Sequence, residues 1–210
     1  MKTLTKEMQD AITPTMALSL LKEGNKRFMN NLKANRNLLQ QANETSEGQH
    51  PFAIILSCID SRTSAELIFD QGLGDIFSVR IAGNIINEDI LGSMEFACKV
   101  AGSKIIAVLG HTKCGAVKGA CDHVEMGNLT VLLSKIQPAI YDEKTESENR
   151  NSSNNEFVEK VSVINVKRTV HAIIERSPIL KEMLEKGEIN IVSGTHHITT
   201  GEVVFYEDIL

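Results

Sequence analysis

The chain has 210 residues, a net charge of −5, and a composition of 42% hydrophobic and 23% charged residues. This balance predicts a single globular domain over residues 1–210, and the acidic charge argues against a nucleic-acid-binding surface, which needs a basic patch. The sequence has no apolar run of the ~20 residues that a membrane span needs and no apolar secretion signal at its N-terminus, so we expect a cytoplasmic protein that binds no membrane.

The N-terminal part is predicted to be helical. Thr13 followed by Pro14 is typical of a helix start, and the apolar residues after it predict an amphipathic helix to about residue 32. We treat residues 1–34 as an N-terminal helical arm. The stretch 35–50, rich in Asn and Gln, is expected to be a loop or a weak helix.

Strands and helices alternate in the rest of the chain. Largely apolar segments predict buried strands over residues 52–57, 76–82 and 104–109, and the last strands are expected over 189–193 and 202–206. Helices are predicted over residues 64–70, 88–100, 113–124, 129–140, 157–175 and 179–186. The polar segment 142–156 is predicted to be a mobile surface loop. The alternation predicts an α/β fold with a mostly parallel central sheet of about four strands plus a C-terminal edge strand, flanked by helices.

Two motifs follow predicted strands at the end where parallel sheets place ligands. Cys58 directly follows the first strand, and His111 and Cys114 follow the third. Cys thiolates and His nitrogens are the ligands that zinc prefers, and a catalytic zinc site has three protein ligands and one open position. His-x-x-Cys alone is a weak signal, but the two motifs at equivalent strand ends are a strong one. Cys98 and Cys121 lie in predicted helices and are interpreted as core residues.

Other residues near these motifs have two interpretations each. Asp60 and Arg62 are either a carboxylate–guanidinium pair that orients a reacting group or a simple structural ion pair or cap. Thr63 is predicted to cap the following helix. Gly83 permits close backbone approach or belongs to a plain turn. Gly115 leaves room for a substrate or lets a helix begin close to the metal.

Cys58-x-Asp60-Ser61-Arg62 and His111-x-x-Cys114-Gly115, about fifty residues apart, resemble the motifs of the β-carbonic anhydrases. Residues 74–84, 109–117 and 21–28 are similar to the same family, so the resemblance covers nearly the whole chain. It implies that Cys58, His111 and Cys114 bind one Zn²⁺ per chain and that Asp60 and Arg62 are catalytic. It also implies that Asp60 can be the fourth zinc ligand in a closed, inactive state.

The resemblance further implies a homodimer or homotetramer in which the helical arm packs on a partner subunit. Gln49 lies nine residues before Cys58, where some members have a substrate-binding Gln in a cleft shared between subunits. Phe77 and Phe96 are the expected apolar walls of that cleft. Ala82, Gly83 and Gly115 complete the expected substrate-binding residues.

The chain also departs from the family pattern. One subgroup has a regulatory bicarbonate site built from a Trp, an Arg and a Tyr; here the Trp position is Ile55, Arg80 remains, and the Tyr position is His197. We therefore expect no such site. His196 and His197 are either a proton relay or, as we prefer, part of a variable C-terminal segment.

The predicted activity is zinc-dependent reversible hydration of carbon dioxide to bicarbonate and a proton, by zinc-bound hydroxide that the Asp60–Arg62 dyad orients. The first alternative is hydrolysis of carbonyl sulfide or carbon disulfide at the same zinc site. The second is a non-catalytic protein that binds zinc or bicarbonate, which the presence of the dyad disfavours.

Overall fold

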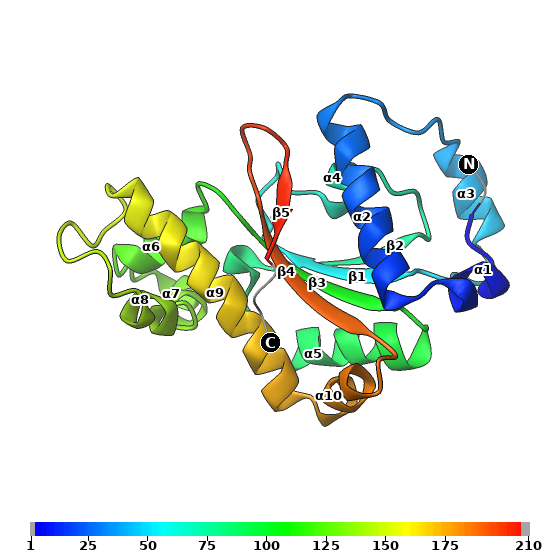
Figure 1. Cartoon of the computed structure of the whole chain (residues 1–210). Helices are drawn as coiled ribbons and strands as arrows, with labels where there is room; N and C mark the ends of the chain where they lie inside the picture. The colour runs from blue at the N-terminus through cyan, green and yellow to red at the C-terminus, as the bar shows by residue number, and fades with distance from the viewer. Residues whose placement is uncertain (1–2, 207–210) are drawn as a thin grey trace.

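The computed structural model describes residues 3–206 and contains a five-stranded sheet with the order β2-β1-β3-β4-β5 (Figure 1). The strands are β1 (Ala53–Ser57), β2 (Ile76–Arg80), β3 (Ile105–His111), β4 (Asn190–His196) and β5 (Val203–Phe205). The first four are parallel, and β5 pairs antiparallel with β4 at the edge. This confirms the predicted α/β fold. Strand β3 ends two residues later than predicted, which places His111 within the sheet.

Alternating side chains of the central strands pack against helices on both faces. Ile54 and Leu56 of β1 belong to a core with α5 (Glu88–Glu95), α9 (Asn155–Arg176) and α10 (Pro178–Glu185). Ala53 and Ile55 point to the opposite face, where they share a core with α2 (Pro14–Met29) and α4 (Ala65–Ile68). This period of two explains why β1 and β3 are apolar at almost every position.

Three further helices lie near the carboxyl ends of the parallel strands. They are α6 (Gly115–Cys121), α7 (Gly127–Ser134) and α8 (Gln137–Asp142), seen at the left of Figure 1 beside α9. A third core cluster joins them to residues at the strand ends, including Cys58, Cys114 and Ile136. The short 3-10 turn η1 (Ala82–Asn84) follows β2 at the same end of the sheet.

The N-terminal arm packs on the sheet of its own chain. In α2, Ala17 and Leu21 are fully buried, and the Thr13 side chain accepts a hydrogen bond from the Met16 N–H, as expected of a helix start. Two helices go beyond the sequence-based expectations. The helix α1 (Lys6–Ala11) was not predicted as a separate element, and α3 (Leu38–Glu44) lies in the stretch expected to be a loop or a weak helix. Contact of the arm with a partner subunit stays a prediction.

The polar segment after α8 is organised around a buried carboxylate. Glu143 is 2% exposed and accepts hydrogen bonds from the Thr145 N–H at 2.8 Å and from Arg150 Nη1 at 2.9 Å. Arg150 also donates to the carbonyl of Ile140. The segment between α8 and α9 therefore has specific internal contacts, and its mobility stays a prediction.

Helix α5 continues through a π turn, η2 (Phe96–Val100), before β3 begins. Among the helices of residues 3–206, none combines the length and the apolar character that crossing a bilayer requires.

Candidate metal centre

Cys58, His111 and Cys114 converge at the carboxyl ends of β1 and β3. These two strands are neighbours in the sheet, with Leu56 opposite Val108. Cys58 therefore leaves one strand beside the point where His111 ends the other, and Cys114 begins α6 a short turn later. The three potential ligand atoms lie within 4.8 Å of one another, and all three residues are buried.

The geometry of these three side chains fits a tetrahedral zinc ion. The two sulfur atoms are 4.0 Å apart, close to the ~3.8 Å that two Zn–S bonds of ~2.3 Å span at a tetrahedral angle. His111 Nδ1 lies 3.0 Å from the Thr112 carbonyl oxygen and donates to it, so the Nε2 lone pair is free. The Nε2 atom of His111 is buried, and it has no hydrogen-bond partner among the described residues. A nitrogen lone pair and two sulfurs thus face one point.

The two thiols are electrostatically coupled. A hydrogen bond from the Cys114 thiol lowers the pKa of Cys58, and the hydrogen bond from the Gly83 N–H acts in the same direction. The Cys58 thiolate and burial in turn raise the pKa of Cys114. Metal binding to both sulfurs therefore has to release a proton from Cys114, and the metal affinity will rise with pH.

Asp60 and Arg62 form a bidentate ion pair on the turn after β1. Arg62 Nε and Nη2 lie 2.9 and 2.7 Å from the two carboxylate oxygens of Asp60. The Arg62 guanidinium holds the pKa of Asp60 below its usual range, so the carboxylate is ionised throughout the neutral pH range. Asp60 is not a member of the cluster formed by the three ligand atoms.

Arg80 and Thr63 hold this turn in place, a role that the sequence did not predict for either residue. Arg80, at the end of β2, donates from Nε to the Cys58 carbonyl at 3.0 Å and from Nη2 to the Asp60 carbonyl. The Thr63 hydroxyl donates to the Cys58 carbonyl at 3.1 Å. The prediction that Thr63 caps the next helix is wrong: Ser64 occupies the N-cap, because the Thr63 hydroxyl is engaged by the turn.

The η1 turn supplies a backbone donor to the centre. Gly83 has φ +69°, and its N–H points at Cys58 Sγ from 3.4 Å. An added Cβ there would lie 2.6 Å from Ile136 Cδ1. From α9, Asn165 Nδ2 donates to the Gly83 carbonyl at 2.8 Å and fixes the peptide orientation. Ala82, the first residue of the turn, is half-buried.

Of the remaining predicted substrate residues, only Gly115 is next to one of the three clustered residues in the sequence. Gly115 directly follows Cys114, is exposed, and has open space where a Cβ would be. Gln49 is exposed on the loop before β1. Phe77 and Phe96 contact each other edge to face, with ring centroids 6.3 Å apart, in a hollow between β2 and α5. None of Cys58, His111 and Cys114 lines that hollow, so within one chain the two rings do not join the centre.

His196 lies opposite His111 in the β3–β4 register. It is buried, and burial lowers its pKa to about 4, so its ring is neutral at pH 7. Neither ring nitrogen has a hydrogen-bond partner among residues 3–206. His197 is half-buried at the turn that leads to β5.

Comparisons with known proteins agree on one family. The sequence model of the carbonic anhydrases matches residues 53–203. Carbonic anhydrase 2 of Mycobacterium tuberculosis is 34% identical over 202 residues, covering 93% of this chain and 94% of the relative. The carbonic anhydrase of Mycolicibacterium smegmatis is 34% identical over 197 residues, covering 90% and 92%.

Solved structures show the same similarity. The β-carbonic anhydrase CcaA superposes with a TM-score of 0.72 at 25% identity, covering 90% of this chain and 95% of that one. The β-carbonic anhydrase CafA of Aspergillus fumigatus gives a TM-score of 0.71 at 25% identity, covering 92% and 90%.

Proposed function

Because this chain belongs to the β-carbonic anhydrase family of enzymes, we propose that it catalyses the reversible hydration of carbon dioxide to bicarbonate and a proton. One observation carries the proposal: two thiols and an imidazole face a single point beside a bidentate carboxylate–guanidinium pair. We propose that Cys58, His111 and Cys114 bind one Zn²⁺ per chain. Zinc in such a site supplies the Lewis acidity that brings the pKa of a water molecule from 15.7 down toward neutrality.

The chain's own residues would orient the reaction. Asp60 is ionised at neutral pH and can accept a hydrogen bond from the attacking oxygen, which directs a lone pair at the carbon of carbon dioxide. Arg62 fixes both oxygens of Asp60 by its two hydrogen bonds. In the alternative closed state Asp60 would turn to the metal, and that rotation would have to break the pair with Arg62.

We propose that the substrate approaches over Ala82, Gly83 and Gly115, because Gly115 leaves open space next to Cys114. Gln49, Phe77 and Phe96 would complete the pocket from a partner subunit, in a homodimer or homotetramer whose helical arms pack across the interface. We also propose a cytoplasmic location, because all four cysteines are free thiols, as is usual in a reducing compartment.

Stopped-flow measurement of carbon dioxide hydration, on protein whose zinc has been assayed, tests this function. We expect one zinc per chain and rapid hydration near pH 8. Asp60→Asn should keep its zinc and lose about 10²- to 10⁴-fold in rate, the usual range for removing a group that handles a proton. Cys58→Ser should lose zinc, whereas Cys98→Ser, which alters a buried thiol outside the cluster, should keep it.

Zinc-loaded protein with no hydration up to about pH 9 would refute the proposal, and carbonyl sulfide and carbon disulfide would then be the substrates to assay. Inactivity of the wild type with all of these substrates would favour a non-catalytic zinc or bicarbonate protein.

A further inference from the structure

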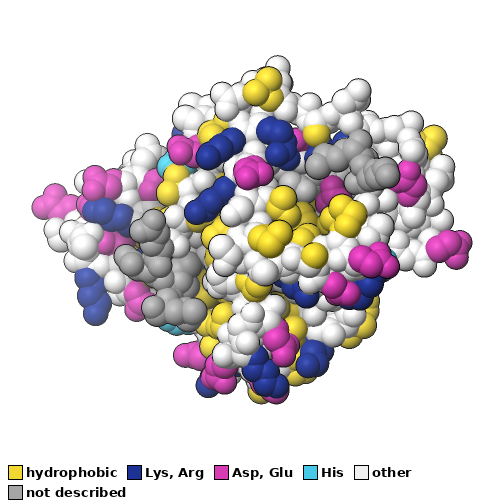
Figure 2. Space-filling model, turned by 45° about the vertical axis from the view of Figure 1, so that its right-hand side comes forward, with side chains coloured by type: hydrophobic (Ala, Val, Ile, Leu, Met, Phe, Trp, Pro, Cys, Tyr) yellow, Lys and Arg dark blue, Asp and Glu magenta, His cyan; other side chains and the backbone are white. Residues whose placement is uncertain are grey.

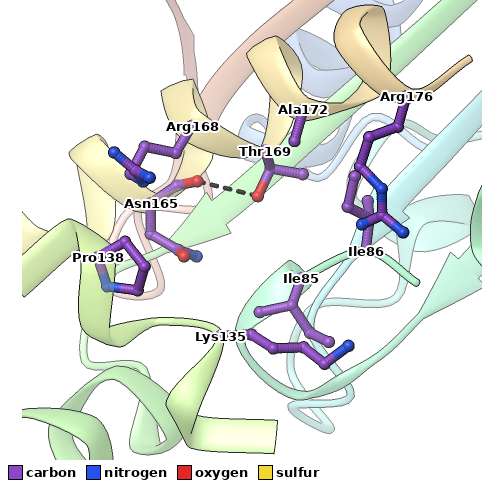
Figure 3. A pocket seen from close by; sticks show the side chains of 9 residues that line it. All are labelled: Ile85, Ile86, Lys135, Pro138, Asn165, Arg168, Thr169, Ala172 and Arg176. Atoms are coloured by element: carbon purple, nitrogen blue, oxygen red, sulfur yellow. Dashed lines mark hydrogen bonds between the residues drawn. The ribbon is translucent and has the colours of Figure 1, made fainter.

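A groove with cationic ends runs along one face of α9, behind the η1 turn. It has a volume of about 260 Å³ and lies between α9, the start of α8 and the chain after η1 (Figure 3). Lys135, Arg168 and Arg176 line it, together with the polar side chains of Asn165 and Thr169. None of the three clustered ligand residues belongs to its lining.

The cations stand at two separate ends. Arg168 and Arg176 are eight residues apart on one helix, a separation of about 12 Å at 1.5 Å per residue. Figure 3 shows them at opposite ends of the drawn helix face, with Thr169 between them. Figure 3 shows the Lys135 side chain extending toward the Arg176 end of the groove. The groove therefore has two positive charges at one end and one at the other.

The neighbouring carboxylates neutralise these charges only weakly. Arg168 pairs with Asp142, and both side chains are about half exposed. Arg176 pairs with Glu88 at 2.6 Å, but the Glu88 side chain is 85% exposed. Exposed pairs of this kind contribute little to stability, so a better-placed anion can replace them. Within residues 3–206, Lys135 makes no ion pair.

The floor of the groove is apolar. Ile85 and Ile86 are 4% and 7% exposed and lie beneath the polar rim, opposite Ala172 of α9. The groove thus has an apolar floor, cations at both ends, and hydroxyl and amide groups between them. It is complementary to a short carbon chain that carries an anionic group at each end. Arg suits such groups, because its planar guanidinium can hold a carboxylate with two hydrogen bonds.

We propose that this groove binds a small organic dianion with one negative group at each end, of the size of a short dicarboxylate. The volume of the groove lies just below the ~300–1,000 Å³ typical of pockets for drug-sized ligands. We therefore expect a ligand smaller than those. Arg168 would bind one anionic group, and Arg176 with Lys135 the other.

Calorimetric titration of the zinc-loaded protein with succinate, at low ionic strength, tests the proposal. We expect saturable binding with one site per chain. Arg168→Gln and Arg176→Gln should each weaken it about tenfold or more, with far-ultraviolet circular dichroism unchanged. Lys181→Gln removes an exposed cation on α10 outside the groove and should leave the affinity unchanged. Glu88→Gln removes the competing carboxylate and should leave the affinity equal or higher.

Acetate and inorganic phosphate serve as comparison probes. Acetate, with one charge, should bind at least tenfold more weakly than succinate, and compact phosphate should not reach both ends. Equal affinity for phosphate and succinate would overturn the two-ended arrangement. Absence of saturable succinate binding, or binding that both Arg variants leave unchanged (as expected of a carboxylate bound at the metal centre), would overturn the site itself.

Discussion

Gly83 occupies a position where any other residue is strained. Its φ of +69° lies in the left-handed region, and an added Cβ would meet Ile136. We predict that Gly83→Ala lowers the free energy of unfolding by about 1–3 kcal/mol. Zinc affinity should fall as well, because the Gly83 N–H donates to Cys58 Sγ and its position depends on this turn. Urea denaturation and a competitive zinc titration measure the two effects.

Gly115→Ala is the matched control for that substitution. Gly115 has no positive φ and nothing within 4 Å of an added Cβ, and it begins α6, where Ala is a better helix former. The free energy of unfolding of the Gly115→Ala variant should therefore stay within about 0.5 kcal/mol of the wild-type value. Equal destabilisation by the two substitutions would contradict the role given to the Gly83 backbone.

At the level of elements, α9 supports the metal centre in part through one buried amide. Asn165 is 3% exposed, and its Nδ2 donates to the Gly83 carbonyl at 2.8 Å. We predict that Asn165→Ala costs about 1–3 kcal/mol, since a buried carbonyl loses its donor. Hydration activity should fall more than global stability explains, because the η1 turn loses its support. Glu175→Ala, at an exposed position of the same helix, should change neither stability nor activity. If Glu175→Ala lost as much stability and activity as Asn165→Ala, the role given to Asn165 would be wrong.

The elements that the sequence predicts correctly are those with a continuous apolar signal. The strands β1 and β3 are buried at every position, so their composition alone identifies them. Helix α1 has no comparable signal: its one buried residue is Gln9, which two distant carbonyls, those of Pro51 and Ala101, hold at 2.8 Å. Such a helix depends on tertiary contacts that no local pattern contains.

The same distinction applies to the site. The placement of both motifs at the carboxyl ends of predicted parallel strands was enough to predict that Cys58, His111 and Cys114 converge. The support from Arg80 could not be predicted, because it depends on the β1–β2 register that sets Arg80 opposite Ser57. The link from Asn165 joins residues 82 positions apart and depends on how α9 crosses the sheet end.

For the whole molecule, Asp70 ties the end of the N-terminal arm to the sheet layer. Its carboxylate is 4% exposed and pairs with Arg27 at 2.5 Å and Arg36 at 2.6 Å. Burial opposes ionisation, but the two guanidinium groups outweigh it and lower the pKa of Asp70. A lowered pKa stabilises the fold above the ordinary value of 3.8, and this stabilisation is lost as the pH falls through the folded-state value.

We therefore predict that Asp70→Asn destabilises the protein by about 3 kcal/mol at pH 7, the usual loss when one partner of a buried ion pair is removed. In urea denaturation, the difference from the wild type should shrink steadily below about pH 4, as the wild-type carboxylate becomes protonated. A difference that stays constant from pH 7 to pH 3 would show that Asp70 acts by packing alone.

One edge of the molecule is suited to a partner subunit. Strand β2 is one of the two edge strands of the sheet, and proteins usually cover or otherwise protect such strands. Beside it, Phe96 is 53% exposed and Val100 71%, and Leu67 of α4 is 57% exposed. Figure 2 shows hydrophobic side chains gathered in the middle of the face that comes forward from the right of Figure 1. Monomeric proteins seldom expose large apolar patches.

We predict that sedimentation equilibrium gives the mass of a dimer or tetramer. Phe96→Glu should shift the protein toward the monomer, because it places a charge beside Phe77 in the hollow along β2. Val131→Glu is the matched control, since Val131 is 64% exposed on α7 and does not line that hollow. If the substrate cleft is shared between subunits, hydration activity should fall together with the mass in Phe96→Glu. A wild-type monomer with full activity would contradict both the interface and the shared cleft.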